Sequence, residues 1–366
     1  MAIPLLDLKA QYLTIKEEID AAIQSVLDSA RFILGPQMKA LEQETAQYCG
    51  VKEAVAVGNG TDALLLALEA LGVGAGDEVI TTPFTFFATA ETVALLGAKP
   101  VFADIDPVTL NLDLAQLEEK ITAKTKAIIP VHIFGQMMDV ERVMEIAARY
   151  DLKVIEDAAQ AMGAEYNGRK AGSIGHAGTF SFFPTKNLGA YGDGGMVITD
   201  DEHLAAQLRM LRFHGCRTKY YHEEIGHNSR LDEIQAAILR VKFRYLDQWN
   251  EARRQAASGY DKLLEDLPLT LPGRDPKAKP IYHLYVVRTD RRQQVMEQLA
   301  EADIASAIYY PVPLHLQKAL RNLGYQEGDF PAAEGAAREA VAIPCYPELT
   351  REQQEHIARV MRKALA

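Results

Sequence analysis

The feature that most constrains the fold is a regular alternation of short apolar strands and amphipathic helices along the first half of the chain. Strands separated by helices are typical of a largely parallel sheet that helices cover on both faces. The predicted strands are residues 54–57, 78–81, 100–102, 126–131, 153–155, 178–181 and 196–199. The helices predicted between them include residues 62–71, 89–96 and 140–149. Ligands bind at the carboxyl ends of the strands in open α/β sheets, so functional residues are expected there.

Helical patterns flank this α/β core. Residues 12–28 have helical periodicity, and a second helix runs from Pro36 to about Cys49. Residues 231–267 form one long helix or two, and we interpret them as the connection to a second domain. A smaller α+β unit is expected after a proline-rich loop, with a strand at 282–288 and helices at 291–302, 332–341 and 351–365. We predict a large domain over residues 1–245, including the N-terminal helical segment, and a small C-terminal domain over residues 246–366.

Composition narrows the class of protein. The 366 residues carry 39 basic and 50 acidic side chains, a formal net charge of −11, which argues against a general nucleic-acid binder. The three cysteines form no C-x-x-C pair, so a zinc or redox motif is not expected, and an odd number without a framework favours a reducing compartment. We see no signal peptide and no apolar run of roughly 20 residues that could span a bilayer. No membrane association and a cytoplasmic location are therefore expected.

A glycine-containing turn follows the first strand, at Gly58-Asn59-Gly60-Thr61, and a helix begins at once. The free N–H groups and the dipole of a helix start favour an anion, particularly phosphate. A simple strand-to-helix turn, with Thr61 or Asp62 capping the helix, explains the same residues equally well.

Two carboxylates, Glu156 and Asp157, follow a later strand in the segment VIEDAAQ. A buried carboxylate can stabilise a protonated ring nitrogen, because an opposite charge favours the charged form. Acidic residues are also favoured at helix starts, and for this motif alone that reading is the better one.

A lysine, Lys186, lies between an aromatic strand end and a run of glycines in TFSFFPTKNLGAYGDGG. A desolvated and oriented lysine amine forms Schiff bases with carbonyl groups. The hydroxyl of Ser181, in the same segment, could hold a phosphate. A single lysine is usually a solvated surface residue, and that interpretation suits nearly every other lysine of this chain.

The segment PFTFF follows another strand and offers Phe84, Phe86 and Phe87 as a wall on which a flat ring could stack. Core packing is the alternative, and we expect it for two of the three. Phosphate loop, aromatic wall, acid and lysine thus follow four strand ends of one sheet, which together point to pyridoxal phosphate (PLP).

At this point the chain resembles the DegT/DnrJ/EryC1/StrS family of sugar aminotransferases, which belongs to the fold type I, aspartate-aminotransferase-like PLP enzymes. The resemblance covers essentially the whole chain, and the lysine segment is its most specific part. The segments that carry it are DLKAQY, ILGP, NGTDAL, GDEVI, ETVALLGAKPVFADID, EDAAQA, SFFPTKNLGAYGDGG, NSRLDEIQAAIL and YPVPLHLQ.

The resemblance implies the roles of residues around the cofactor. Lys186 would hold PLP as a Schiff base and then act as acid and base in the proton shift. Asp157 would pair with the pyridinium nitrogen, Gln160 would contact the ring hydroxyl, and Phe86 would stack on the ring. The residues implied to bind the phosphate are Gly60, Thr61 and Ser181, joined by Asn228 from a neighbouring subunit.

The resemblance also implies partners. Because Asn228 would reach the neighbouring subunit's cofactor, the active unit would be a homodimer with shared sites. Nucleotide-sugar contacts are implied for Arg230, Tyr309, Tyr310 and His315. The implied function is a PLP-dependent aminotransferase that converts a nucleotide-linked keto sugar, UDP- or dTDP-linked, to the amino sugar, with glutamate as amino donor.

Alternatives remain open within and beyond this class. Some relatives carry histidine in place of the lysine and dehydrate sugars, whereas Lys186 favours transamination. The form NGTDAL, with Asp62, leans towards amination of a 3-keto sugar over a 4-keto sugar. A PLP sugar dehydratase or lyase and a PLP-binding regulatory protein are the remaining readings.

Two other segments resemble known binding motifs, but we do not expect either of them to bind a ligand. The segment LGVGAGD is spaced G-x-G-x-G and precedes a strand, so it is a turn and not a dinucleotide loop. The histidines and glutamates between His222 and His227 contain no H-E-x-x-H, and a solvated loop without a metal is expected.

Overall fold

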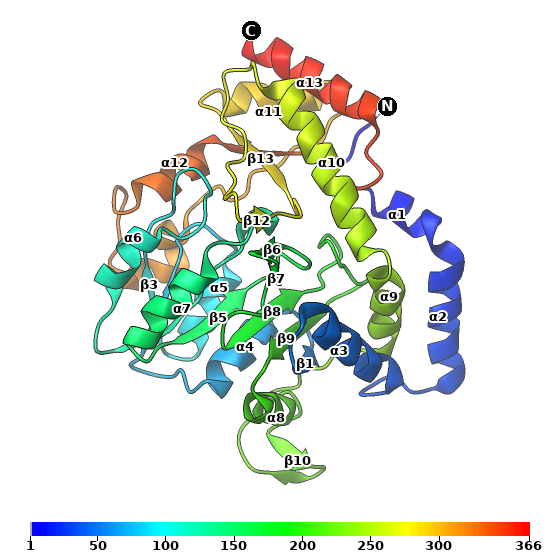
Figure 1. Ribbon diagram of the computed structural model, residues 1–366, viewed down its shortest axis with the longest axis vertical. Coiled ribbons are helices and arrows are strands. Elements are labelled where there is room, and N and C mark those ends of the chain that lie inside the picture. The colour runs from blue at the N-terminus through cyan, green and yellow to red at the C-terminus, as the bar shows by residue number, and fades with distance from the viewer. Residues whose placement is uncertain (1) are drawn as a thin grey trace.

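A seven-stranded sheet with the order β1-β9-β8-β5-β4-β2-β3 forms the centre of the computed structural model, which describes residues 2–366 (Figure 1). Strand β9 runs in the direction opposite to the other six strands of this sheet. The strands are β1 (Glu53–Val57), β2 (Glu78–Thr81), β3 (Lys99–Phe102), β4 (Thr125–Ile128), β5 (Lys153–Asp157), β8 (Ala177–Ser181) and β9 (Gly195–Thr199). The predicted α/β class with a mostly parallel sheet is confirmed.

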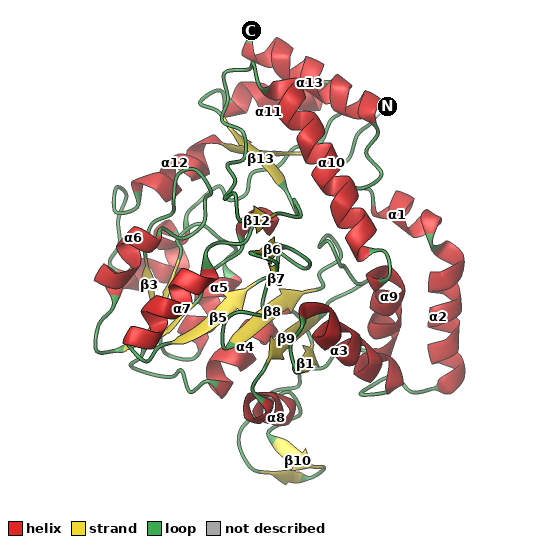
Figure 2. Ribbon diagram, in the orientation of Figure 1, coloured by secondary structure: helices red, strands yellow, loops and turns green. Residues whose placement is uncertain are grey.

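Helices cover both faces of this sheet, as Figure 2 shows. Successive side chains of a strand point to opposite faces. Val154 accordingly packs against α3 (Pro36–Cys49) and α7 (Val140–Arg149), in one buried apolar cluster. Ile155 packs on the other side, in a second cluster with residues of the remaining covering helices. Those helices are α4 (Gly60–Ala70), α5 (Ala88–Leu95) and α8 (Glu202–Leu211).

The N-terminal segment contains two helices where one was predicted. Helix α1 (Leu8–Thr14) ends at Ile15, whose φ of −129° and ψ of 19° leave the helical region, and α2 (Lys16–Ser29) begins directly after it. The break turns the apolar stripe of α2 onto α9 (Glu233–Phe243), where Ile19 is buried. Helix α2 therefore lies outside the main body, beside α9 (Figure 1).

The long helical pattern after residue 231 also resolves into two helices, α9 and α10 (Leu246–Leu264). The predicted helix over 332–341 is too long. Helix α12 (Pro331–Glu339) stops there, and β14 (Ala340–Ile343) pairs antiparallel with β13 (Tyr285–Arg288). The run AVAI suits a buried helix or strand equally, so pairing with β13, which periodicity does not reveal, decides its state.

The C-terminal part has its own apolar cluster, built mainly on α10, α11 (Arg292–Glu301) and α13 (Arg351–Leu365). That cluster also contains Ile3 from the N-terminus, whereas α12 packs against aromatic side chains of the large sheet. The division at residues 245 and 246 stays a prediction.

Short elements complete the chain, and the hairpin of β10 and β11 projects beyond α8 in Figure 1. Within residues 2–366, no helix is both long and apolar enough to cross a membrane. The short elements are α6 (Leu114–Leu117), β6 (Glu165–Tyr166), β7 (Arg169–Lys170), β10 (Cys216–Thr218), β11 (Tyr221–His222), β12 (Ala278–Lys279) and the 3-10 turns Glu118–Lys120, Ile133–Gly135, Leu314–Leu316 and Lys318–Leu323.

Candidate active site

A cavity of ≈ 990 Å³ lies at the carboxyl ends of β1, β2, β5 and β8 and is closed by segments of the C-terminal part. Each of the four predicted motifs follows one of these strands, and the strands run parallel to one another, so the motifs meet at one edge. Nine of the twelve predicted site residues line the cavity. They are Gly60, Thr61, Phe86, Asp157, Gln160, Ser181, Lys186, Tyr309 and Tyr310.

Lys186 follows β8 and faces the cavity. Among residues 2–366 its amine has no hydrogen-bond or ion-pair partner. Desolvation lowers the pKa of Lys186 to about 8, against the opposing effect of the Asp157 charge. A larger fraction of this amine than of an ordinary lysine is therefore uncharged near neutral pH and available as a nucleophile.

Asp157 is the last residue of β5 and is buried. Its Oδ2 accepts a hydrogen bond from Thr89 Oγ1 at 2.8 Å, and its Oδ1 accepts one from the Ala159 N–H at 3.2 Å. Burial raises the pKa of Asp157, and these bonds and the charge of Lys186 oppose the rise. A ligand that brings a positive charge to this carboxylate would be stabilised by it.

The adjacent carboxylate, Glu156, points to the other face of β5 and away from the cavity. It accepts hydrogen bonds from His132 Nε2 at 2.8 Å and from the N–H groups of Gly172, Ile174 and Gly175. Burial acts to raise the pKa of Glu156, but these donors outweigh it and hold the pKa below its usual value. Strand alternation separates the two acids, and only Asp157 can meet a ligand in the cavity.

The phosphate-loop motif forms the first turn of α4. Asn59 caps this helix by accepting a hydrogen bond from the Asp62 N–H at 2.8 Å, which leaves the N–H groups of Gly60 and Thr61 without a helical partner. The backbone at Gly60 passes close to Ser181, because a Cβ on residue 60 would lie 2.6 Å from the Ser181 Cβ. Glycine is required there, and the turn brings two N–H donors and a hydroxyl together.

The aromatic motif divides as expected. Phe84 is fully buried, whereas Phe86 is 57% exposed and its ring lies 6.4 Å from that of Tyr310 at an interplanar angle of 45°. Gln160 joins this wall, since its Nε2 donates to Tyr310 Oη at 3.0 Å and its Oε1 accepts from the Phe134 N–H at 2.8 Å. Phe86 therefore has an open face on which a planar ring can stack.

Three predicted residues lie outside the cavity. Asn228 is exposed and forms a backbone bridge with Phe213, and the Arg230 guanidinium lies 5.5 Å from the centre of the Phe213 ring. His315 is buried, with Nε2 3.1 Å from Glu334 Oε1. The ring of His315 is thus held inside the protein, and its substrate contact stays a prediction.

Sequence reasoning missed six polar residues that line the cavity: Thr85, Thr89, Thr185, Asp193, Arg253 and His283. Thr89 lies in the first turn of α5, and its Oγ1 reaches Asp157 Oδ2 at 2.8 Å, but no motif in the sequence marks it. Burial, followed by the charges of Lys186 and Arg253, lowers the pKa of His283 well below its usual value. No motif marks Arg253 or His283.

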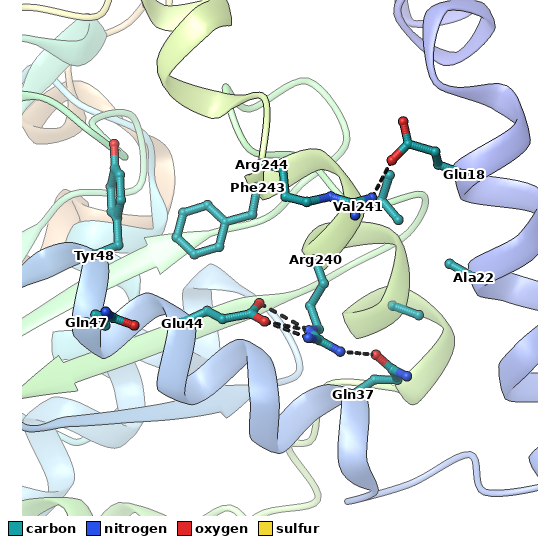
Figure 3. Close-up of a pocket in the computed structure, with 11 residues that line it drawn as sticks. Glu18, Ala22, Gln37, Glu44, Gln47, Tyr48, Arg240, Val241, Phe243 and Arg244 are labelled. Atoms are coloured by element: carbon teal, nitrogen blue, oxygen red, sulfur yellow. Dashed lines mark hydrogen bonds and ion pairs between the residues drawn. The ribbon is translucent and has the colours of Figure 1, made fainter.

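A second cavity, of ≈ 810 Å³, lies between α2, α3 and α9 (Figure 3). Its arginines are already paired: Arg240 binds Glu44 at 2.6 Å, and Arg244 binds Glu18. No comparable free lysine or acid faces this cavity. Within the described part of the chain no group of three or more His, Cys, Asp or Glu residues could hold a metal ion.

The first cavity fits PLP. It offers a free lysine amine for an aldehyde, a buried carboxylate for a ring nitrogen, an exposed aromatic face and a helix start with a nearby hydroxyl for a phosphate. A family model described as the DegT/DnrJ/EryC1/StrS aminotransferase family matches residues 13–362. The chain belongs to this family.

Similar proteins span the whole length of this family member. A Geobacillus stearothermophilus protein named pleiotropic regulatory protein is 54% identical over 361 residues, which cover 98% of this chain and 97% of that protein. UDP-N-acetyl-3-dehydro-alpha-D-glucosamine 3-aminotransferase of Acidithiobacillus ferrooxidans is 47% identical, with coverage of 100% and 98%. The crystal structure of S. venezuelae DesV in complex with a ketimine intermediate has a TM-score of 0.98 and 44% identity, and covers 100% of this chain and 99% of that one.

These findings confirm the predicted fold type and enzyme class. The chain is an aminotransferase of a PLP-dependent family, with the cofactor that the four motifs indicated. The roles of single residues stay predictions.

Proposed function

We propose that this enzyme transfers an amino group from glutamate to the keto carbon of a nucleotide-linked 3-keto sugar, carried by UDP or dTDP, with PLP held on Lys186. The observation that carries the proposal is the free amine of Lys186 and the buried carboxylate of Asp157 facing one cavity. The 3-keto assignment is supported by the name of the Acidithiobacillus relative and by Asp62, which lines the cavity next to Thr61.

In this proposal each residue holds a charge or moves a proton. When bound, PLP supplies an electron sink for the bonds at the reacting carbon. Asp157, fixed by Thr89, would hold the positive charge of the ring nitrogen. The amine of Lys186 would be released during turnover. It would then carry a proton between the reacting carbon of the substrate and the cofactor, for which its pKa of about 8 is suited. Phe86 would fix the plane of the ring, and Gly60, Thr61 and Ser181 its phosphate.

A regulatory role is the second candidate, because the Geobacillus relative carries a regulatory name. A protein that only binds PLP needs neither a free proton-transferring amine nor a buried acid at the ring. The arrangement of Lys186 and Asp157 therefore supports catalysis, and any regulatory effect would follow from the amino sugar produced. Lys186 stands at the position where some relatives carry histidine, and this lysine supports transamination over dehydration.

The proposal includes a homodimer with shared sites. Residues 228–230 lie beside the phosphate loop, where Ser229 Oγ donates to Asp62 Oδ2 at 2.6 Å. Asn228, however, is exposed and does not line the cavity of its own subunit. The neighbouring hairpin exposes large apolar side chains, including Tyr220 at 78% and Ile225 at 90%. A partner subunit would cover these side chains and receive Asn228.

We also propose a cytoplasmic location, which the three unpaired cysteines support.

The chemistry is tested by separating the two half-reactions. Purified protein reconstituted with PLP should be yellow, and borohydride should fix the cofactor on Lys186, as peptide mass analysis would show. Glutamate alone should convert the bound cofactor to its amino form, and a 3-keto nucleotide sugar should restore it. A panel of UDP- and dTDP-linked 3-keto and 4-keto sugars assigns the acceptor. No conversion by any amino donor would leave the regulatory or lyase readings standing.

Shared sites are tested by mixing two inactive variants, Lys186→Ala and Asn228→Ala, after unfolding and refolding together. If Asn228 serves the partner's site, an equal mixture contains heterodimers with one intact site. About a quarter of the native activity should then return, by the statistics of random pairing. A mixture that remains inactive, although light scattering shows dimers, would contradict the shared site.

A further inference from the structure

Arg253, on α10, is a buried cation of the cavity wall with no role in the chemistry described so far. It is 3% exposed, yet it lines the cavity together with Lys186 and Asp157. Its Nη1 donates to the backbone carbonyls of Cys345 at 2.6 Å and Tyr282 at 3.2 Å. Among residues 2–366, its Nε and Nη2 donate to no group. Part of this guanidinium is therefore committed to the backbone, and part is free.

No carboxylate neutralises Arg253. It forms no ion pair in the described chain, and Glu348, whose charge reaches it, forms no hydrogen bond with it. Burial raises the pKa of Glu348, which favours the uncharged acid. An unpaired buried charge is costly, and truncation or pairing of such a group changes binding strongly. The guanidinium is thus prepared for an anion that the chain itself does not supply.

The surroundings strengthen such an interaction. Leu5, Leu6, Leu284 and Ile308 line the same cavity. Apolar walls lower the local dielectric, so a carboxylate would be attracted more strongly here than at the surface. An arginine with two free N–H directions also matches the two oxygens of a carboxylate.

The position of Arg253 relative to Lys186 indicates which anion. Arg253, Lys186 and His283 all line this cavity, and the charges of Arg253 and Lys186 both reach the ring of His283. In an α-amino acid, the reacting nitrogen and the carboxylate are bonded to the same carbon. A group that binds this carboxylate must therefore lie close to the reacting amine. A nucleotide phosphate is many bonds away from the keto carbon, so a group that binds the phosphate can lie far from the amine.

We propose that Arg253 binds the α-carboxylate of the amino donor, through its Nε and Nη2, and so orients the donor's amino group towards the cofactor on Lys186. This proposal rests on the aminotransferase function above. It assigns donor recognition to a residue of α10, separate from the residues that were predicted to contact the sugar.

The test compares the two half-reactions in Arg253→Gln. Conversion of the PLP form by glutamate should need about 10- to 100-fold more donor, the loss expected for a charge-assisted hydrogen bond. Conversion by the amino-sugar product should change far less. Arg254→Gln is the matched control, because Arg254 is the next residue and pairs with Glu251 on the same helix at 2.9 Å. It should behave like the native enzyme in both half-reactions.

Binding without turnover gives an independent measurement. Calorimetric titration of the PLP-loaded enzyme with 2-oxoglutarate, which cannot react with this form, should show about 10- to 100-fold weaker binding in Arg253→Gln. The native enzyme should also prefer glutamate to 4-aminobutyrate, in which hydrogen replaces the α-carboxylate. That preference should disappear in the variant.

Three outcomes would overturn the proposal. The first is an equal loss in both half-reactions, which would mark Arg253 as a structural support for the carbonyls of Tyr282 and Cys345. The second is no loss in either. The third applies even if the variant fails to fold: native enzyme that uses 4-aminobutyrate as well as glutamate has no α-carboxylate anchor. If native enzyme accepts no amino donor at all, the proposed function fails instead.

Discussion

Lys186 and Lys242 are both buried lysines, and desolvation lowers the pKa of each to about 8. They differ in what the amine faces. Lys242, in α9, is 1% exposed and donates to the carbonyl of Gly189, whereas Lys186 faces the cavity without a partner. A lowered pKa therefore does not identify a reactive amine. We propose that the reactive amine is the one whose hydrogen-bonding capacity the protein leaves unused.

The same contrast separates Asp157 from Glu156. Glu156 is surrounded by donors of its own chain, and Asp157 keeps room for a ligand. We propose that in each pair one member stabilises the fold and the other serves the chemistry. Substitutions in matched pairs test this distinction.

The largest effect is expected at Lys186. Lys186→Ala removes the covalent link and the proton carrier, so turnover should fall by at least roughly a thousandfold. Borohydride should fix no cofactor on the variant. Lys242→Met, the matched substitution, should retain both the fixed cofactor and turnover within about tenfold of native. Loss of covalent cofactor in Lys242→Met would end the distinction between the two lysines.

A smaller but still large effect is expected at Asp157. Asp157→Asn keeps the shape of the site but cannot hold a charged ring nitrogen, so turnover should drop by roughly a hundredfold or more while PLP is still bound. Cofactor retention is followed by absorbance and turnover by the glutamate half-reaction. Native turnover in this variant would contradict the role of Asp157.

Glu156→Gln should affect stability and leave the chemistry nearly intact. The amide keeps one acceptor oxygen for the backbone donors but presents an N–H₂ group where the second oxygen was. The free energy of unfolding should fall by about 1–3 kcal/mol, measured by urea denaturation. Activity per folded molecule should stay within about fivefold of native. A selective loss of activity with unchanged stability would place Glu156 in the catalytic machinery.

Much of this arrangement was readable from the sequence, for identifiable reasons. Alternating patterns predicted the sheet because its strands are buried on both faces, and the four motifs were found because each follows a strand. The run AVAI was misassigned because its state depends on pairing with β13. Arg253 was missed because it lies in a polar helix whose sequence, NEARRQ, does not show which arginine turns inward. Residues brought in by the C-terminal part depend on tertiary packing and left no local signal.

The smallest effect concerns how the stability of the fold depends on pH. The folded-state pKa of Lys242 is about 8 and its ordinary value is 10.5, so between these pH values the folded protein binds fewer protons than the unfolded chain. The contribution of Lys242 to the free energy of unfolding should therefore rise as the pH increases from about 8 to about 10. In cofactor-free protein Lys186 adds to this rise for the same reason, and PLP bound to its amine should remove that share. Urea denaturation across this range, in native protein and in Lys242→Met, separates the two contributions. The slope of the free energy of unfolding against pH should be smaller in Lys242→Met than in native protein, with or without PLP. Binding of PLP should lower this slope only where Lys186 is intact. An unchanged slope in Lys242→Met would mean that Lys242 keeps its proton in the fold, and the two lysines would then differ in charge as well as in surroundings.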